Sequence, residues 1–188
     1  MNDVTQLRDY LLIRRIRAGD DDAWEELVNL YYGTIYSYCF RRCYGQRQLA
    51  EDLTQEIFLK LIKNLEHFQF TGKFFNYLFT IAVNTCNSYY QKKNFDYAEL
   101  HENIAEQAEN EAALKHLVAA DTAEELQIYL DELPDMQREA LILKYFHQLK
   151  VKEIAKITEV SVPTAQSRIN QGLSKLKKML DREEFHFE

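Results

Sequence analysis

A run of polar side chains near the carboxyl end of the chain has the chemistry and spacing needed to read DNA. Asn and Gln can form two hydrogen bonds with one adenine edge, and Arg and Lys bind phosphates. Residues three or four positions apart share one face of a helix, so these side chains would project together. The candidate contacts to duplex DNA are Thr164, Gln166, Ser167, Arg168, Asn170, Gln171 and Lys175.

The residues before this run form a helix-turn-helix pattern that would position it. Pro134 stands where the first turn of a helix tolerates proline, and an apolar run follows at 141–146. A shorter apolar run covers 151–158, and Ser161 is placed as the N-cap of the last helix. Two helices joined by a turn of about three residues are typical of this DNA-binding motif.

Charge along the chain supports nucleic-acid binding at this end. Residues 150–180 hold seven basic and two acidic side chains, a net charge of +5 in a chain whose total is −7. The acid is concentrated in the middle, where residues 94–121 hold seven acidic side chains and one lysine. Two near-neutral modules therefore flank an acidic connector. The alternative for the +5 segment is an ordinary helical hairpin with a solvated basic face.

Apolar residues recur every three or four positions through the amino-terminal half, which predicts amphipathic helices. The expected helices cover 4–17, 20–45, 48–65 and 74–93. In the first helix we place Leu7, Tyr10 and Leu11 on the buried side, together with Ile13 or Ile16. The third helix carries a polar, acidic face opposite its apolar row, with Glu51, Asp52, Gln55 and Glu56. This face is either a solvated helix surface or a docking surface for a basic partner.

The loop at 67–73 and the helix after it are dense in aromatic residues beside lysines. Rings stack on bases and ammonium groups meet phosphates, the combination that single-stranded nucleic acid needs. The alternative is a phenylalanine-rich core, to which most of these rings belong. The polar side chains near the rings are Gln69, Thr71, Lys73, Lys92 and Lys93.

Composition bounds the class of protein. A chain of 188 residues forms one large domain or two small ones, and its 5 glycines and 2 prolines favour helices. No apolar run approaches the ~20 residues of a membrane helix, and the first residues lack the apolar region of a signal peptide. An odd number of cysteines without zinc-type spacing fits reduced thiols in a cytoplasmic protein. These are Cys39, Cys43 and Cys86.

Three segments resemble parts of bacterial RNA polymerase sigma factors of the extracytoplasmic-function (ECF) group. Residues 50–58, AEDLTQEIF, are similar to the stretch that docks on the clamp helices of the polymerase. Residues 75–85, FNYLFTIAVNT, resemble the segment that melts and reads the downstream promoter element. Parts of 133–168 resemble the module that reads the upstream element. The three segments stand in the family's order, and the resemblance covers about residues 10–180.

The resemblance implies an all-α protein with two helical domains. Residues 1–93 would form the amino-terminal domain, 94–120 an acidic linker threaded through a basic channel of the polymerase, and 121–188 the helix-turn-helix domain. The chain would bind core RNA polymerase and direct promoter-specific transcription initiation on duplex and single-stranded promoter DNA. No cofactor and no membrane insertion are expected. An inhibitory anti-sigma factor is an expected partner.

The resemblance also assigns roles to side chains. A base flipped from the non-template strand would meet Gln69, Thr71, Lys73 and Asn84, with Lys92 and Lys93 nearby. The polymerase contacts would be Asp52, Gln55, Glu56 and Phe58. In the last helix Gln166, Ser167, Asn170 and Gln171 fall where the family reads bases, and Arg168 would bind phosphate. Glu159 stands where glycine is common, and a left-handed backbone there would add strain of about 1 kcal/mol.

Two other functions fit parts of the pattern. A free-standing helix-turn-helix regulator would bind duplex DNA as a dimer at palindromic half-sites. It leaves the aromatic loop and the acidic face around Asp52 without a role. A helical adaptor that binds no nucleic acid leaves the +5 segment unexplained. An enzyme is not expected, because the five histidines form no metal-spaced set and the sequence has no nucleophile or phosphate-loop motif.

Overall fold

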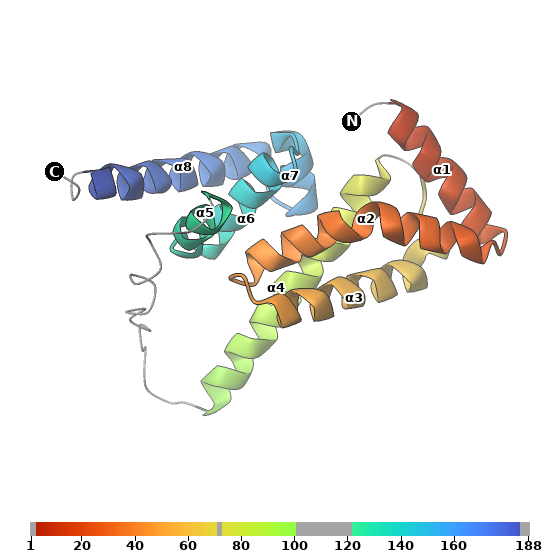
Figure 1. Ribbon diagram of the computed structural model, residues 1–188, viewed down its shortest axis with the longest axis horizontal. Coiled ribbons are helices and arrows are strands. Elements are labelled where there is room, and N and C mark those ends of the chain that lie inside the picture. Colours follow the sequence, from red (N-terminus) through yellow and green to blue (C-terminus); the bar gives the residue numbers. More distant parts are fainter. Residues whose placement is uncertain (1–2, 71–72, 101–121, 185–188) are drawn as a thin grey trace.

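The computed structural model describes residues 3–70, 73–100 and 122–184, and it is built from helices (Figure 1). No strand occurs in these ranges, which confirms the all-α expectation for them. The first part holds α1 (Asp3–Arg17), α2 (Asp21–Arg42), α3 (Arg47–Asn64), the 3-10 helix η1 (Leu65–His67) and α4 (Phe74–Leu100). The second part holds α5 (Thr122–Asp131), α6 (Asp135–Leu141), the π-helical turn η3 (Ile142–Phe146), α7 (Val151–Ile157) and α8 (Val162–Glu184).

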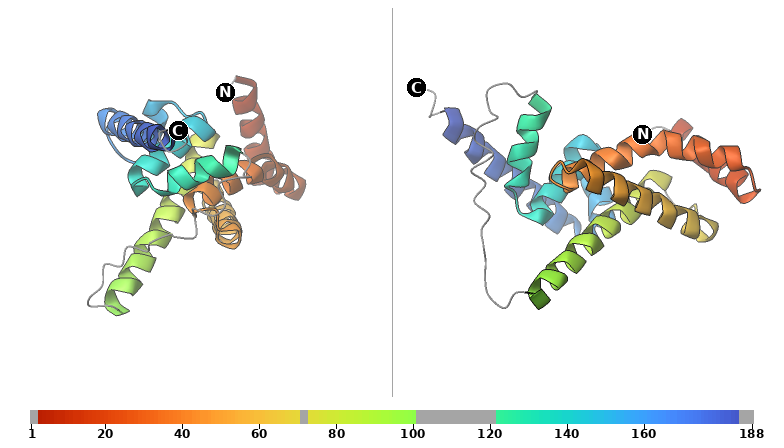
Figure 2. Two further views of the ribbon diagram at one scale, coloured as in Figure 1. Left: turned by 60° about the vertical axis from the view of Figure 1, so that its left-hand side comes forward. Right: turned by 60° about the horizontal axis from the view of Figure 1, so that its bottom comes forward.

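Helix α2 lies at the centre of the first part, between α1, α3 and α4 (Figure 2). Asp20 caps its first turn, because its carboxylate accepts a hydrogen bond from the Ala23 N–H at 3.3 Å. Its buried row, Leu27, Tyr31, Ile35 and Tyr38, is at most 4% exposed and follows the predicted spacing. The apolar stripes of the neighbouring helices close on this row, so α2 is the element on which the others pack.

The predicted buried side of α1 is wrong at Leu7, Tyr10 and Leu11 and confirmed at Ile13 and Ile16. Leu7, Tyr10 and Leu11 are 59%, 45% and 47% exposed, whereas Leu12, Ile13 and Ile16 are buried. Nearly every position from 10 to 16 is apolar or basic, so helical spacing alone permits both sides. Asp9 selects one side, because its buried carboxylate accepts a 2.6 Å hydrogen bond from the Tyr31 hydroxyl of α2.

The second part is a helix-turn-helix unit in which α8 packs across α6 and α7. The Ser161 hydroxyl accepts a hydrogen bond from the Thr164 N–H at 3.2 Å, which confirms Ser161 as the N-cap of α8. Glu159 has φ +54°, so the left-handed conformation that the turn requires is taken by a residue with a side chain. At the crossing of α8 and α6, a Cβ on Gly172 would lie 2.8 Å from Leu141 Cδ1, so a larger residue would require the Leu141 side chain to shift.

The two parts lie against each other, with α7 and η3 in contact with α4 and α2 (Figures 1 and 2). Helix α4 continues to Leu100, seven residues beyond the limit of 93 predicted for the first domain. The rest of the predicted acidic linker, 101–120, lies outside the described residues. None of the described helices is both long enough and apolar enough to span a membrane. Within the same ranges, no three His, Cys, Asp or Glu side chains are grouped to hold a metal ion.

Candidate nucleic-acid interface

The polar row predicted on the last helix lies on the exposed side of α8. Ala165 and Ile169 point into the core at 0% and 2% exposure, which turns the positions between them outward. Gln166 and Asn170 are joined by a 2.8 Å hydrogen bond, and Gln171 donates to Ser167 at 3.0 Å. These hydrogen bonds fix the positions of the amide side chains relative to one another. The exposed members are Thr164, Gln166, Ser167, Asn170, Gln171 and Lys175, and Arg168 is half-buried.

Basic side chains flank this row. Lys152 and Lys156 are exposed on α7, and Lys175, Lys177 and Lys178 are exposed toward the end of α8. Ammonium groups on both sides of a row of amides can bind the two phosphate backbones that border a DNA groove, while the amides reach the base edges. The arrangement therefore matches a helix that reads duplex DNA, as the spacing predicts.

A second candidate surface is a cavity of about 440 Å³ between the aromatic loop, α4 and α7. The rings of Phe68 and Tyr77 line it with their centroids 4.5 Å apart, and amide side chains stand around them. Rings give a base a stacking surface and amides can bond its edge, so the cavity has the chemistry to hold one base. The amides are Asn64, Gln69 and Asn76.

The structure brings together only some of the predicted downstream contacts. Gln69 and Lys73 line the cavity, while Asn84 and Lys92 are exposed farther along α4 and do not line it. Thr71 and the side chain of Lys93 lie outside the described residues. The sequence reasoning missed Asn64 and Asn76. Their positions in the sequence could have indicated them, because Asn64 precedes the aromatic loop and Asn76 follows it.

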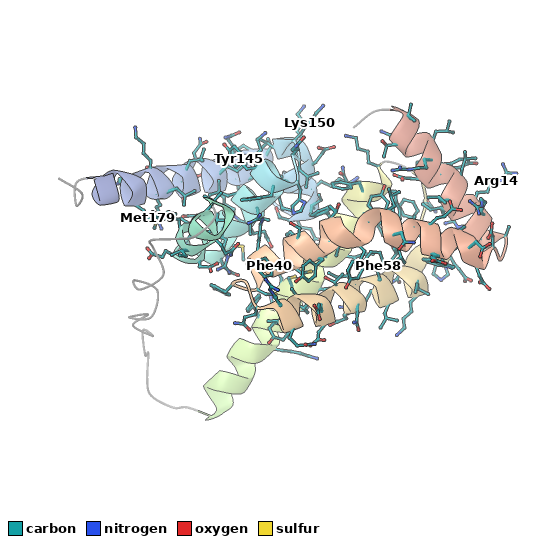
Figure 3. The ribbon with its side chains drawn as sticks, in the orientation of Figure 1. Arg14, Phe40, Phe58, Tyr145, Lys150 and Met179 are labelled. Carbon is teal, nitrogen blue, oxygen red and sulfur yellow. The ribbon has the colours of Figure 1, made fainter. Side chains whose placement is uncertain are left out.

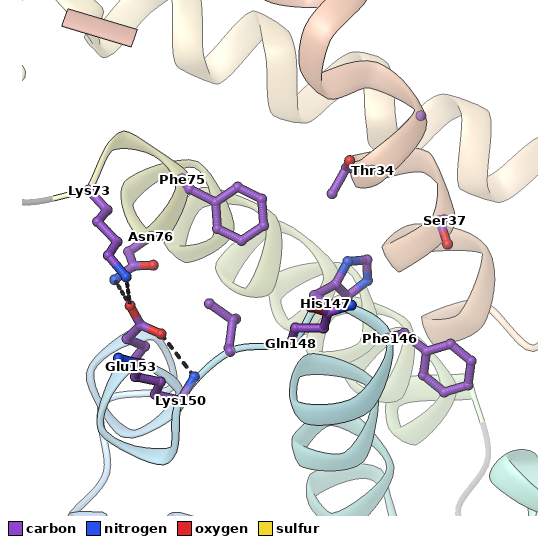
Figure 4. Close-up of a pocket in the computed structure, with 12 residues that line it drawn as sticks. Thr34, Ser37, Lys73, Phe75, Asn76, Phe146, His147, Gln148, Lys150 and Glu153 are labelled. Atoms are coloured by element: carbon purple, nitrogen blue, oxygen red, sulfur yellow. Dashed lines mark hydrogen bonds and ion pairs between the residues drawn. The ribbon is translucent and has the colours of Figure 1, made fainter. Parts of the chain in front are cut away.

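Lys73 and Asn76 are already bonded to another part of the chain. The Lys73 ammonium lies 2.7 Å from a carboxylate oxygen of Glu153 on α7, and Asn76 donates to the same oxygen at 3.4 Å (Figure 4). The second oxygen of Glu153 accepts the Lys150 N–H at 2.9 Å. Burial acts to raise the pKa of Glu153, but the bonds from Lys73 and Lys150 outweigh it, so the pKa lies below its ordinary value.

A further cavity of about 540 Å³ borders this ion pair, between α2, α4 and the segment 146–150 (Figure 4). The ring of His147 enters it from the second part, packed 4.8 Å from Phe79 and 5.9 Å from Tyr38 between centroids. Burial and the nearby charge of Arg41 lower the pKa of His147 to about 4. The imidazole is therefore neutral at pH 7 and belongs to the contact between the two parts.

The acidic face of α3 is exposed as predicted, with Asp52, Gln55 and Glu56 at the surface. Two short contacts stay within the helix: Gln48 donates to Asp52 at 3.3 Å, and Glu56 pairs with Lys60 at 2.7 Å. Phe58 is 6% exposed and lies where α2 and α3 meet (Figure 3). Its ring stacks on Tyr32, with centroids 6.1 Å apart.

An apolar groove of about 290 Å³ adjoins this acidic face, and sequence reasoning missed it. Phe58 and Val28 form its walls with Tyr32, and Leu59 and Ile62 border it at 57% and 47% exposure. Leu59 and Ile62 are three positions apart and outside the buried row of α3, which is the signal that could have found them. Exposed apolar residues grouped beside polar ones are a common mark of a protein-binding surface.

Known families match both parts of the chain. The family model described as Sigma-70 region 2 matches residues 27–95, which hold most of α2 to α4. The model described as Sigma-70, region 4 matches residues 121–176, which hold α5 to α7 and most of α8. The first range holds the α3 face and the second holds the α8 row, while residues of both line the base-sized cavity.

Characterised proteins match over nearly the whole length. The ECF RNA polymerase sigma factor SigW of Bacillus subtilis is 32% identical over 180 residues, covering 89% of the chain and 94% of that protein. The ECF RNA polymerase sigma-E factor of Escherichia coli K12 is 32% identical over 173 residues, covering 87% and 90%. The ECF RNA polymerase sigma-E factor of Haemophilus influenzae is 32% identical over 174 residues, covering 87% of the chain and 90% of that protein.

Two solved structures share the fold. One is the sigma factor RpoE in complex with the anti-sigma factor NepR from Bartonella quintana, with a TM-score of 0.68 and 20% identity, covering 84% of the chain and 96% of that protein. The other is CnrH in complex with the cytosolic domain of CnrY, with a TM-score of 0.68 and 22% identity, covering 93% and 98%. At these identities the likeness concerns the fold.

Proposed function

The chain belongs to the ECF sigma factors, which bind core RNA polymerase and direct it to promoters, and we propose which of its surfaces perform each step. Three surfaces are involved: the α3 face, the base-sized cavity beside α4, and the α8 row. The observation that carries the proposal is the α8 row, where the amides that suit base edges are exposed on one face and lysines flank them. The chain then acts by binding rather than by catalysis.

The α3 face docks on the polymerase. Asp52, Gln55 and Glu56 offer acceptors to basic side chains, and the groove bordered by Leu59 and Ile62 offers apolar contact beside them. A buried apolar centre with a polar rim is the usual anatomy of a stable protein interface. Phe58 contributes as a wall of the groove and as support for Tyr32, because only 6% of it is exposed.

The cavity beside α4 takes a base from the opened non-template strand. Phe68 and Tyr77 supply the stacking surface, and Gln69, Asn64 and Asn76 supply donors and acceptors for the base edge. Unstacking a base costs a few kcal/mol, which these contacts offset only when the base fits them. Thr71, Asn84, Lys92 and Lys93 remain candidates for the strand on either side.

The α8 row reads the upstream element in duplex DNA. Gln166, Ser167, Asn170 and Gln171 contact base edges, and Thr164, Arg168 and Lys175 hold the phosphates beside them. An anti-sigma factor is the inhibitory partner that we propose for this chain, by analogy with the RpoE structure, whose fold it shares. The chain works in the cytoplasm, where the polymerase is, and its acidic linker lies in a channel of the enzyme.

The proposal is tested by co-elution of the chain with bacterial core RNA polymerase, followed by run-off transcription from a promoter library. Binding with discrete start sites is the expected result. Replacing Asp52 and Gln55 together by alanine should weaken co-elution while helicity by circular dichroism stays unchanged. Glu25→Ala, an exposed acid on α2, is the matched control and should co-elute as the unaltered chain does.

Two outcomes contradict the proposed surfaces. Unchanged co-elution of the Asp52 and Gln55 variant removes α3 as the docking face. Tight binding of the isolated chain to duplex promoter DNA, with no co-elution, would favour a free-standing regulator instead. Weak duplex binding by the isolated chain is expected, because its two small basic surfaces can make few phosphate contacts.

A further inference from the structure

Helix α6 contacts the α8 row through one amide side chain. The amino group of Gln137, on α6, donates a hydrogen bond to the side-chain oxygen of Gln171 at 2.9 Å. The amino group of Gln171 in turn donates to the Ser167 hydroxyl oxygen at 3.0 Å. Gln171 therefore has a partner on each of two helices, whereas the 2.8 Å hydrogen bond from Gln166 to Asn170 stays within α8.

The crossing of α6 and α8 holds these side chains at a fixed separation. Leu141, one turn after Gln137, is 1% exposed and lies against Gly172, the neighbour of Gln171. A Cβ on Gly172 would lie 3.5 Å from the Gln137 Cβ, so the two helices approach closely at this point. Gln137 is half-buried in the crossing, which limits the freedom of its side chain before any DNA binds.

The buried oxygen of Gln137 indicates how the two amides are oriented. Gln137 Oε1 is buried and accepts no hydrogen bond among the described residues. The reverse orientation would bury an amino group, with two N–H donors, at the same place. A buried oxygen with an unused lone pair is tolerated more readily than an unpaired N–H. Gln137 therefore donates to Gln171, which keeps the Gln171 side-chain oxygen on the side of α6.

Gln171 still has the groups that one adenine edge requires. A side-chain amide has two lone pairs on its oxygen and two N–H donors on its nitrogen. Gln137 and Ser167 use one of each in Gln171, so one lone pair and one N–H remain. Adenine presents its amino group as a donor and N7 as an acceptor in the major groove. The order of the two remaining groups on Gln171 decides whether they match this edge.

We propose that Gln137 is a positioning residue for base recognition: it fixes the orientation of the Gln171 amide, so that Gln171 selects adenine at one base pair of the upstream element. This inference rests on the proposed function, since it concerns base reading by the α8 row. Without Gln137, the Gln171 amide can turn over and keep its bond to Ser167, because a hydroxyl both donates and accepts. The turned amide exchanges its donor and its acceptor and no longer matches adenine.

Run-off transcription by the full-length chain with core RNA polymerase tests this inference on a library with all four bases at each upstream position. Gln171→Ala first identifies the base pair that Gln171 reads. Gln137→Met removes the hydrogen bond but keeps the length of the side chain. Gln137→Glu supplies a carboxylate that only accepts, so the Gln171 amide must turn to donate to it. Gln127→Met is the matched control, because the Gln127 amide bonds to Asp131 on its own helix at 2.7 Å.

We expect Gln137→Met to lower the preference for adenine at that base pair by about three- to tenfold, since the Gln171 amide becomes free to turn. Gln137→Glu should abolish the preference for adenine there. The preference at the base pair that Gln166 reads should stay unchanged in both variants, as should every preference in Gln127→Met. In a chain that carries Gln171→Ala, Gln137→Met should have no further effect, because both changes act through one side chain.

An unchanged preference in folded Gln137→Met overturns the inference. An equal change at the base pairs of Gln166 and Gln171 also overturns it, because a loosened α6 would disturb the whole row. If circular dichroism shows that Gln137→Met is unfolded, Gln137→Glu decides by the same comparison. Failure of the proposed function gives a different result, since Gln171→Ala then leaves every base preference unaltered. If the inference alone fails, Gln171→Ala changes the preference at one base pair and Gln137→Met changes none.

Discussion

The α8 row and the base-sized cavity beside α4 are built from similar side chains but differ in access. In the α8 row, Gln166 and Gln171 bond to neighbours within the same part of the chain and face outward. Beside the cavity, Lys73 and Asn76 bond to Glu153 from the other part of the chain. The comparison shows that residue type determines which ligand each surface can bind. Packing between the two parts determines whether that surface is accessible to the ligand.

Contacts between helices within one part of the molecule also differ from contacts between the two parts. Helices within each part meet through apolar rows such as Leu27 and Ile35, whereas the two parts meet through Arg42 and its acids beside the ring of His147. The apolar burial within a part is lost only when that part unfolds. Ions can leave an interface and be hydrated, so the second contact is the one expected to open.

Arg42→Met is the change with the largest expected effect on this difference. It leaves Glu139 buried without its cation, which destabilises the closed state, in which the two parts are in contact, by about 3–5 kcal/mol. Because Glu139 then gains by reaching water, we expect the chain to open rather than to unfold. Hydrogen exchange should show loss of protection in α6 and at the end of α2. Adding Glu139→Gln should restore part of the protection, and Arg15→Met, at an exposed pair, should change it little.

Variants of the α8 row sharpen the upstream side of the comparison. Gln166→Ala or Gln171→Ala should change preference at particular upstream bases by about 1–3 kcal/mol, because an amide that bonds one base edge discriminates among bases. Arg168→Ala should weaken all promoters alike, since a phosphate contact carries no sequence information. Run-off transcription over a panel of single-base changes measures both. Equal patterns for the amide and arginine variants would contradict the division of roles.

Acid should loosen the contact between the two parts through His147. Its pKa is about 4 when it is buried in the contact and ~6.5 when it is solvated, so the open form binds more protons between these values. Stability of the closed state is therefore complete above about pH 6.5 and falls by about 2 kcal/mol at pH 5. The radius of gyration should rise on acidification.

His147→Phe is the control for that prediction, because a phenyl ring can pack between Tyr38 and Phe79 and does not titrate. The pKa of Glu139 is raised by burial, which acts in the opposite direction and favours the closed state in acid. The prediction therefore concerns the difference between the two chains. A radius that depends on pH equally in both would remove His147 as the cause.

The smallest expected effect concerns Glu159 in the turn before α8. Glycine adopts φ +54° without strain, so Glu159→Gly should stabilise the second part by up to about 1 kcal/mol. Thermal unfolding should then shift upward by about 2–4 °C. Lys152→Gly, at an exposed position inside α7, should lower the midpoint instead. The radius of gyration should not change in either variant, because neither residue pairs with Arg42 or its acids.

Much of the fold could be predicted from the sequence because it depends on local patterns. The helices α2 and α3 begin and end close to the predicted limits, and α8 begins after Ser161, which caps it as expected. The exposed positions of the α8 row follow from helical spacing around Ala165 and Ile169. The buried side of α1 could be predicted only in part, at Ile13 and Ile16, because both of its sides carry apolar residues and Asp9 needed a partner on α2.

The sequence by itself determined the family, the helices and the chemistry of each candidate surface, because residue type and periodicity are properties of neighbouring positions. Only the tertiary structure decided that Glu153 would cover Lys73, that Arg42 would be buried against Asp135 and Glu139, and that Asn64 and Asn76 would flank one cavity. The physical reason is distance along the chain. Glu153 lies 80 positions from Lys73 and Glu139 lies 101 from Tyr38, and no local pattern specifies such pairs.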